Sequence, residues 1–147
     1  MAFAGPAEDA ARDDGVCLGV PAGRAERREG RAPPPPPYRG RVRILVDDLR
    51  SFPDTAPALV ARTSAAGVVL LQRYREQHLD ELWLDHDLGG DDTIWPVVEL
   101  LERAAFDGAP YDIGIVHVHS ANPPGAAKVL QTLRRWSYNA RLTVFPA

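Results

Sequence analysis

The sequence predicts an α/β domain in which a parallel sheet carries helices on both faces. Three observations support this fold class. From residue 41 onward, short runs of Val, Ile and Leu alternate with segments whose apolar residues recur at helical spacing. Several of the apolar runs end directly in polar clusters, as strands do when they lead into site-bearing loops. The roughly 107 residues from 41 to 147 are enough for one independent core.

Residues 1–40 differ in composition from the rest of the chain. They hold seven of the 14 prolines and six of the 12 glycines, including five consecutive prolines at 33–37. A segment with so few large apolar side chains cannot offset its ordering entropy, about 1–2 kcal/mol per residue. We therefore predict a disordered tail over 1–40 and a folded domain over 41–147. The proline run should form a polyproline II spacer, which could also dock on a proline-binding module.

The first half of the domain contains two predicted strands and one predicted helix. Val42–Val46 is an apolar run, and Ala58–Ala61 forms a short second strand. Thr63 or Ser64 is placed to cap the helix that follows. The expected inner face of this helix has apolar residues at spacing i, i+3, i+4 and i+8, namely Ala66, Val69, Leu70 and Tyr74.

Three strands and two helices are predicted after residue 80. The strands are Glu81–Leu84, Ile113–Val118 and Leu142–Phe145. Thr93 is expected to cap a helix that tolerates Pro96 in its first turn. The apolar stripe of that helix comprises Ile94, Val97, Val98, Leu101 and Ala105. The last helix opens at Pro123 and should bury Ala126, Val129, Leu130 and Leu133.

Composition and charge exclude several classes of function. With 17 basic and 20 acidic residues, and a net charge of −3, the chain lacks the excess positive charge that bulk nucleic-acid binding requires. No apolar stretch is long enough to cross a bilayer, and charged residues interrupt the first 15 positions. We therefore expect neither a membrane span nor a secretory signal, and a cytoplasmic location. The single cysteine, Cys17, allows no internal disulfide.

Polar residues follow three of the predicted strands directly. The clusters are Asp47–Arg50, Asp85–Asp87 and His119–Asn122. Because parallel strands present their carboxyl ends at one edge of a sheet, the three clusters should meet there. So many carboxyl and imidazole groups in one place would shift one another's pKa values unless an ion is bound. The pattern predicts a site for an anion and a metal at this edge.

These clusters resemble a known family. Val-Asp-Asp-Leu-Arg at 46–50, Leu-Asp-His-Asp-Leu-Gly at 84–89 and His-Ser-Ala-Asn-Pro-Pro-Gly at 119–125 look like the cyclic-phosphate processing receiver-like family, an offshoot of response-regulator receivers. The resemblance covers about residues 42–147. It implies a receiver-like (flavodoxin-like) sheet of five parallel strands. Residues 51–57 leave too little room for the usual first helix, which should be shortened or missing.

One departure from the receiver pattern separates two classes of function. A phosphorelay receiver carries a lysine and then a proline at the end of its last strand. This chain has Phe145-Pro146 at that place, and the only lysine in the chain is Lys128. An atypical receiver phosphorylated on Asp85, or a non-catalytic binding or signalling module, is therefore the alternative to an enzyme. Two imidazoles at the strand ends, His86 and His119, favour the enzyme, because phosphorelay chemistry has no use for them.

The resemblance implies hydrolysis of a cyclic phosphate on a small nucleotide-like substrate. Candidates are 2′,3′-cyclic nucleotides and an ADP-ribose cyclic phosphate, from RNA repair or nucleotide salvage. Receiver-like aspartates imply Mg²⁺ or Mn²⁺, with Asp47, Asp48 and Asp85 as ligands. His86 and His119 are the candidate acid and base, in either order, and Asp85 is the third expected catalytic residue.

Further residues are expected to bind the phosphate or to support the site. Arg50 offers a bidentate grip on phosphate oxygens, and Ser120 and Asn122 could donate to the same oxygens. Gly125 and its neighbour at the helix start should supply free backbone N–H groups. Asp87 is expected to orient His86 or Arg50 without contacting the ligand itself.

Three other features have more ordinary structural interpretations. His117 shares a strand face with His119 but lies one layer deeper, so it is interpreted as a core histidine. Asp91-Asp92 precedes a helix and is interpreted as a capping pair. The tryptophans are interpreted as core residues, and among them Trp95 is the best candidate for a platform under a base.

Overall fold

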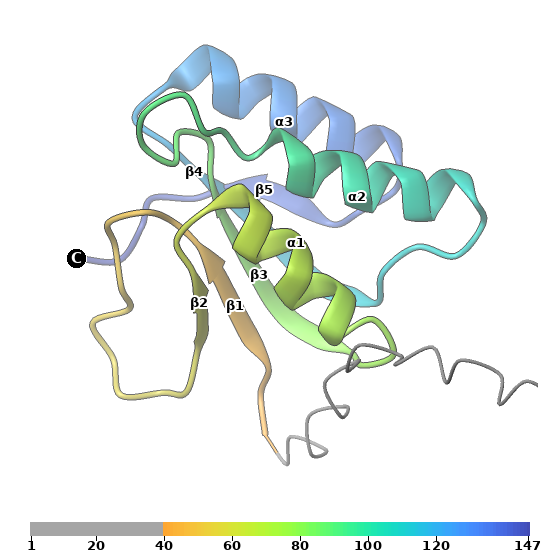
Figure 1. The fold of residues 1–147 in the computed structure, drawn as a ribbon, viewed down its shortest axis with the longest axis horizontal. Helices are drawn as coiled ribbons and strands as arrows, with labels where there is room; N and C mark the ends of the chain where they lie inside the picture. The colour runs from red at the N-terminus through yellow and green to blue at the C-terminus, as the bar shows by residue number, and fades with distance from the viewer. Residues whose placement is uncertain (1–39) are drawn as a thin grey trace, which may run out of the picture. The chain divides into compact units, whose positions relative to one another are not determined.

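The computed structural model describes residues 40–147, which form a five-stranded parallel sheet and three helices (Figure 1). The predicted tail over 1–40 lies outside these residues, except for Gly40. The strands are β1 (Arg43–Val46), β2 (Leu59–Ala61), β3 (Leu79–Asp85), β4 (Ile113–His119) and β5 (Ala140–Leu142). The helices are α1 (Ser64–Arg73), α2 (Trp95–Phe106) and α3 (Pro123–Arg135). The order across the sheet is β2-β1-β3-β4-β5, and every neighbouring pair is parallel.

The α/β class and the five parallel strands are confirmed, but the prediction of helices on both faces is wrong. The crossovers from β2 to β3, from β3 to β4 and from β4 to β5 all step in one direction across the sheet. Right-handed crossovers that step in one direction place their helices on one face. The step from β1 to β2 runs the other way, and residues 47–58 contain no helix. In the part of the chain that the structure describes, the absence of the expected first helix therefore leaves the second face without a helix.

The helix-covered face of the sheet holds an aliphatic core. Strand residues of one parity point into it, and each is at most 1% exposed: Ile44, Val46, Leu82, Leu84, Val116 and Val118. They pack against the inner residues of all three helices, including Leu71, Val97, Leu101, Val129 and Leu133. The predicted stripes of the last two helices are thereby confirmed.

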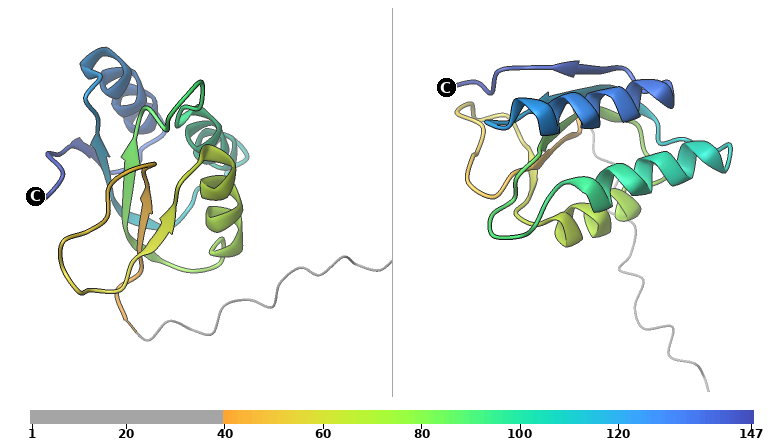
Figure 2. Two further views of the ribbon diagram at one scale, coloured as in Figure 1. Left: turned by 60° about the vertical axis from the view of Figure 1, so that its left-hand side comes forward. Right: turned by 90° about the horizontal axis from the view of Figure 1, so that it is seen from above.

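On the second face, which carries no helix from residues 40–147, two irregular segments cover the sheet. In the left view of Figure 2, the loop 47–58 and the C-terminal end lie on one side of the strands, and α1 and α2 lie on the other. Phe52 of the loop and Phe145 of the C-terminal segment stack with ring centroids 5.4 Å apart, and both meet Trp83 of β3 edge-on. We call this surface of the sheet the helix-free face.

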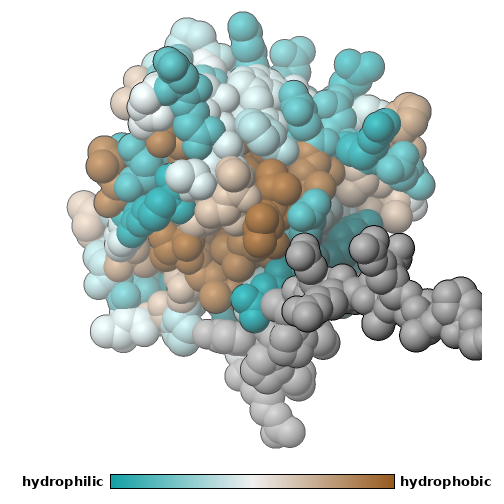
Figure 3. Space-filling view, viewed as in Figure 1, coloured by the Kyte–Doolittle hydropathy of each residue, from teal (hydrophilic) through white to brown (hydrophobic). Residues whose placement is uncertain are grey.

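Helix α1 packs by a different stripe from the predicted one. Gly67, Leu71 and Tyr74 are buried, whereas Val69 is 63% exposed. A Cβ atom on Gly67 would lie only 3.0–3.2 Å from side-chain atoms of Val97 and Val46, so glycine permits the close approach that sets the stripe. The predicted stripe is partly turned outward, and apolar side chains gather over α1 and the adjoining strands in Figure 3.

The helix starts are capped in part as predicted. Thr63 caps α1, since its side chain accepts from the Ala66 N–H. The prediction that Thr93 caps α2 is wrong, because Ile94 occupies the N-cap position without a side-chain hydrogen bond. Asp92 does cap a helix, but a different one: its carboxylate accepts from the backbone N–H and the hydroxyl of Ser64 at the start of α1.

The last strand is β5 at Ala140–Leu142, so the prediction of Leu142–Phe145 is wrong except for its first residue. As the edge strand, β5 pairs only with β4, and Ala140 alone in it is buried. A strand of three residues is too short to show the alternation of apolar and polar residues by which a strand is predicted from sequence. Within residues 40–147, no helix has both the length and the hydropathy that a bilayer crossing requires.

Candidate functional site

Three buried side chains converge where β1, β3 and β4 end. Asp47 follows β1 directly, Asp85 ends β3 and His119 ends β4. One potential ligand atom from each lies within 4.8 Å of the other two. Parallel register produces this meeting, since Asp85 pairs with His119 across β3 and β4 and the Asp47 N–H still donates to Ala61 of β2. The predicted meeting of the three clusters is thus observed for Asp47, Asp85 and His119.

Asp47 is fully buried and receives hydrogen bonds at both carboxylate oxygens. Oδ1 accepts from the backbone N–H groups of Leu49 and Arg50 at 2.8 and 2.6 Å. Oδ2 lies 2.8 Å from Nε2 of His119 and 3.2 Å from Nη1 of Arg50. Burial raises the pKa of Asp47, but these hydrogen bonds outweigh it and hold the pKa below its ordinary value. Asp47 is therefore an anion at neutral pH.

Arg50 joins the two buried carboxylates. The same nitrogen, Nη1, donates to Asp47 at 3.2 Å and to Asp85 Oδ2 at 3.0 Å. Burial and the neighbouring Asp47 carboxylate raise the pKa of Asp85, and the charges of His119 and Arg50 only partly oppose them. The guanidinium thus provides the positive charge that two adjacent carboxylates require.

His119 is oriented by Asp47 and keeps one ring nitrogen unused. Because the Asp47 carboxylate accepts from Nε2, this nitrogen carries a proton, and in the neutral ring Nδ1 offers a lone pair. Nδ1 is buried and has no hydrogen-bond partner among residues 40–147. A buried polar atom without a partner is uncommon in folded proteins, and such an atom often marks where a ligand or a water molecule binds.

Two arginines hold the loop that carries Asp47 and Arg50. Arg62, just after β2, donates to the carbonyl oxygens of Asp47 and Arg50 and to the Ser51 hydroxyl. Arg43 of β1 is buried and binds both oxygens of Asp54 at 3.0 and 3.1 Å. Its guanidinium also lies 3.8 Å from the centre of the Phe52 ring. The loop is thus held at its start by Arg62 and near its middle by Arg43.

Several predicted site residues lie outside the convergent group. Asp48 is not part of it, and its carboxylate lies beside Gly89, where a Cβ would be 3.1 Å from Oδ2. His86 packs against Gly125 at the start of α3, where a Cβ would be 2.7 Å from its ring. Asp87 orients His86, as expected, with 2.9 Å between its carboxylate and Nδ1.

The expected anion site at the start of α3 is already used by the protein. Asn122 is the N-cap, and its side chain accepts from the Gly125 N–H at 3.1 Å. The Ala126 N–H donates to the Asn122 carbonyl. The prediction that these two groups are free is therefore wrong. Ser120 accepts from the Asn122 N–H, and its hydroxyl proton remains available to a ligand.

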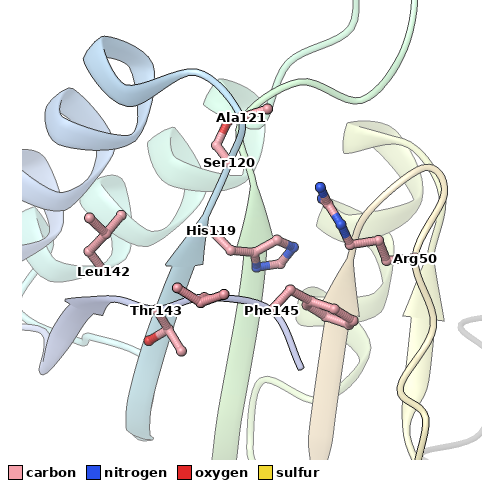
Figure 4. A pocket seen from close by; sticks show the side chains of 8 residues that line it. Arg50, His119, Ser120, Ala121, Leu142, Thr143 and Phe145 are labelled. Atoms are coloured by element: carbon pink, nitrogen blue, oxygen red, sulfur yellow. The ribbon is translucent and has the colours of Figure 1, made fainter. Parts of the chain in front are cut away.

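An open pocket of about 410 Å³ borders the site and includes residues that the sequence analysis did not assign to it. Arg50, His119 and Ser120 line one side of the pocket, and the C-terminal segment 142–145 lines the other. Figure 4 shows His119 and Arg50 pointing toward one another above Phe145. Sequence reasoning noted Phe145 only as the replacement for a receiver lysine, and no local pattern marked it as part of a pocket.

His117 and Trp83 lie on the helix-free face, next to the site and one layer further from the strand ends. Their rings stack at 4.0 Å, and His117 Nδ1 lies 2.9 Å from the Thr143 hydroxyl. Burial lowers the pKa of His117, and the nearby charge of Glu81 only partly opposes it. The interpretation of His117 as a structural histidine agrees with these contacts. Trp95, the predicted platform, instead packs against the core.

Comparison with known families agrees with this geometry. The model of the family described as the cyclic-phosphate processing receiver domain matches residues 42–135, the stretch from β1 to the end of α3. No curated protein matches the sequence. The match includes Asp47, Asp85 and His119, the three side chains that converge at the strand ends. The chain belongs to the cyclic-phosphate processing receiver domain family.

Proposed function

We propose that the protein hydrolyses a small cyclic phosphate of the nucleotide type, with a divalent metal, at the convergent group of Asp47, Asp85 and His119. One observation carries the proposal: the buried Asp47–His119 hydrogen bond beside two carboxylates that a single arginine bridges. An imidazole oriented by a carboxylate and placed beside a cation is suited to activating water against a phosphodiester. Family membership supports a cyclic phosphate as the substrate class.

Ring opening adds one water across one P–O bond. The water oxygen bonds to phosphorus and loses a proton, one ring P–O bond breaks, and the departing oxygen gains a proton. We assign the first proton to Nδ1 of His119, whose other nitrogen Asp47 holds. His86, oriented by Asp87 at the end of the neighbouring strand, is the candidate donor to the departing oxygen. Arg50 and the Ser120 hydroxyl would hold the phosphate oxygens.

Asp47 and Asp85 fit a divalent metal, since both are buried at the same edge and offer oxygen atoms within 4.8 Å. Mg²⁺ and Mn²⁺ commonly take one or two carboxylates together with water and substrate phosphate. A bound metal would supply Lewis-acid stabilisation of the phosphate charge. One oxygen of each carboxylate accepts from Arg50, so a metal held at these oxygens would compete with Arg50, and the displaced guanidinium would be available to phosphate.

The direct test is ³¹P NMR of the protein with Mg²⁺ or Mn²⁺ and a panel of 2′,3′-cyclic nucleotides and ADP-ribose cyclic phosphate. Five-membered cyclic phosphates resonate well apart from their opened monoesters, so turnover is read directly. We expect the cyclic signal to disappear, and we expect EDTA and His119→Gln each to prevent this.

Other outcomes would replace the proposal with its alternatives. Metal-dependent shifts of a cyclic ligand without turnover would indicate a binding module. Labelling of the protein by acetyl phosphate, lost in Asp85→Asn, would indicate a receiver that is phosphorylated on Asp85. Absence of all three signals would leave no support for a phosphate ligand at this edge.

A further inference from the structure

We infer that the pocket beside His119 has a second, uncharged half that binds the nucleoside part of the substrate against Leu142, Val144 and Phe145. The inference rests on the proposed function and adds to it where the remainder of the substrate lies. It assigns a binding role to the C-terminal segment 142–145, which lies beyond the stretch that the family model matches.

The pocket joins the two halves without a break. The same cavity is lined by Arg50, His119 and Ser120 on one side and by residues 142–145 on the other (Figure 4). Its volume of about 410 Å³ lies in the range usual for small-molecule sites, about 300–1,000 Å³. A ligand whose phosphate meets Arg50 and His119 therefore has its remaining atoms within reach of the C-terminal segment.

The uncharged half of the pocket has large apolar side chains that are exposed to solvent. Leu142 is 63% exposed and Val144 is 91% exposed, and both line the pocket. Phe145 is fixed in place by stacking on Phe52 and by edge contact with Trp83. A wall that is already ordered loses little entropy when a ligand binds it.

The distribution of charge indicates the class of ligand. Arg50 provides a cation at one end of the pocket, whereas none of Leu142, Thr143, Val144 and Phe145 carries a charge. The Thr143 hydroxyl is within hydrogen-bond distance of His117. A molecule that fits both halves is anionic at one end and flat and uncharged at the other, as a nucleoside cyclic phosphate is. A cyclic phosphate without a base would leave the wall uncovered.

Two ligands and one double variant test this inference. Binding of adenosine 2′,3′-cyclic phosphate and of glycerol 1,2-cyclic phosphate is measured by calorimetry, and turnover of both by ³¹P NMR. Leu142→Asn with Val144→Asn should raise the Kd of the nucleotide about tenfold, as loss of one or two buried methyl groups implies, and leave the glycerol ligand unchanged. Asparagine adds no charge, so the phosphate end is not disturbed. Val69→Asn, at an exposed valine of α1 that does not line the pocket, is the matched control.

The outcomes separate this inference from the proposed function. Selective loss of nucleotide binding supports the inference, even if the wild type turns over neither ligand and hydrolysis is thereby refuted. Equal affinity of the wild type for both ligands, or equal loss in the double variant, overturns the inference while turnover would still support hydrolysis. A double variant that changes only the sedimentation coefficient also overturns it, because Leu142 and Val144 would then contact a second copy of the chain.

Discussion

The two faces of the sheet are built from different chemistry. On the helix-covered face, six aliphatic strand residues pack against three helices. On the helix-free face, neighbouring positions of the same strands carry Arg43, Trp83, His117 and His119, under a loop and a C-terminal segment. Ion pairs, ring stacking and a few hydrogen bonds hold this second cover in place.

This difference shows how loss of one helix can be used for a binding site. A helix on the second face would cover the sheet with an apolar stripe, as the three helices do on the first. The loop 47–58 instead places Arg50 and Phe52 over the sheet and leaves the pocket open at its edge. The helix-covered face therefore provides stability, and the helix-free face provides the candidate chemistry.

The largest effect is expected at His119 on the helix-free face, the base of the proposed hydrolysis. His119→Gln should lower kcat for a cyclic phosphate about 10²–10⁴-fold, the usual contribution of a general base. His117→Gln, the same change one layer deeper on the same face, is the matched control and should alter kcat only a few-fold. Comparable losses in both variants would mean that both histidines act structurally and that His119 is not the base.

The next effect concerns stability and compares one residue from each face. Leu84→Ala should lower the free energy of unfolding by about 3–5 kcal/mol, because Leu84 is fully buried among the helices. Phe52→Ala should cost about 1–2 kcal/mol, because Phe52 is half-buried and its loop can collapse. Urea denaturation measures both. Equal costs would show that the loop belongs to the core as fully as the helices do.

A smaller effect is expected on metal affinity. Arg50→Gln removes the cation that bridges Asp47 and Asp85, so Mn²⁺ should bind about tenfold more tightly, a typical size for loss of one competing charge contact. Calorimetry or the EPR signal of free Mn²⁺ measures the Kd of Mn²⁺ and requires no turnover. Arg62→Gln is the control, since Arg62 binds backbone oxygens of the same loop but neither carboxylate. Unchanged or weaker binding in Arg50→Gln would show that Arg50 and the metal do not compete.

The fastening of the loop is tested by Arg43→Met. Asp54 is half-exposed and Glu81 keeps its ion pair with Arg41, so neither carboxylate is left buried without a partner. The free energy of unfolding should therefore fall by only about 1 kcal/mol. Amide hydrogen exchange over residues 49–56 should nevertheless accelerate, because the contacts to Asp54 and Phe52 are lost. Unaltered exchange in this segment would assign its order to Arg62 alone.

The smallest effect is a pH dependence from His117. Burial lowers its folded-state pKa below the unfolded value of 6.5, so the fold favours the neutral ring. Its contribution to stability is complete above pH 6.5 and is lost as the pH falls through the folded-state pKa. His117→Phe keeps the stack on Trp83 and should flatten the decline of the free energy of unfolding below pH 6.5. Parallel curves for the two proteins would contradict this assignment.

The sequence by itself determined the α/β class, the parallel strands, the missing first helix and the edge at which the site lies. These features depend on local patterns: apolar runs, cap residues, and polar clusters placed directly after strands. Asp47, Asp85 and His119 come together because parallel strands end at one edge, which chain order already implies.

The tertiary structure alone decided which residues share the site and what covers each face. The stripe of α1 follows from the close approach at Gly67, and the separation of His86 from the group follows from its packing on Gly125. Asn122 consumes the expected anion site, and Phe145 joins the pocket from the end of the chain. Each of these depends on contacts between segments far apart in sequence, so no local spacing carries the information. Local patterns set where strands begin and end, and long-range packing sets which side chains meet.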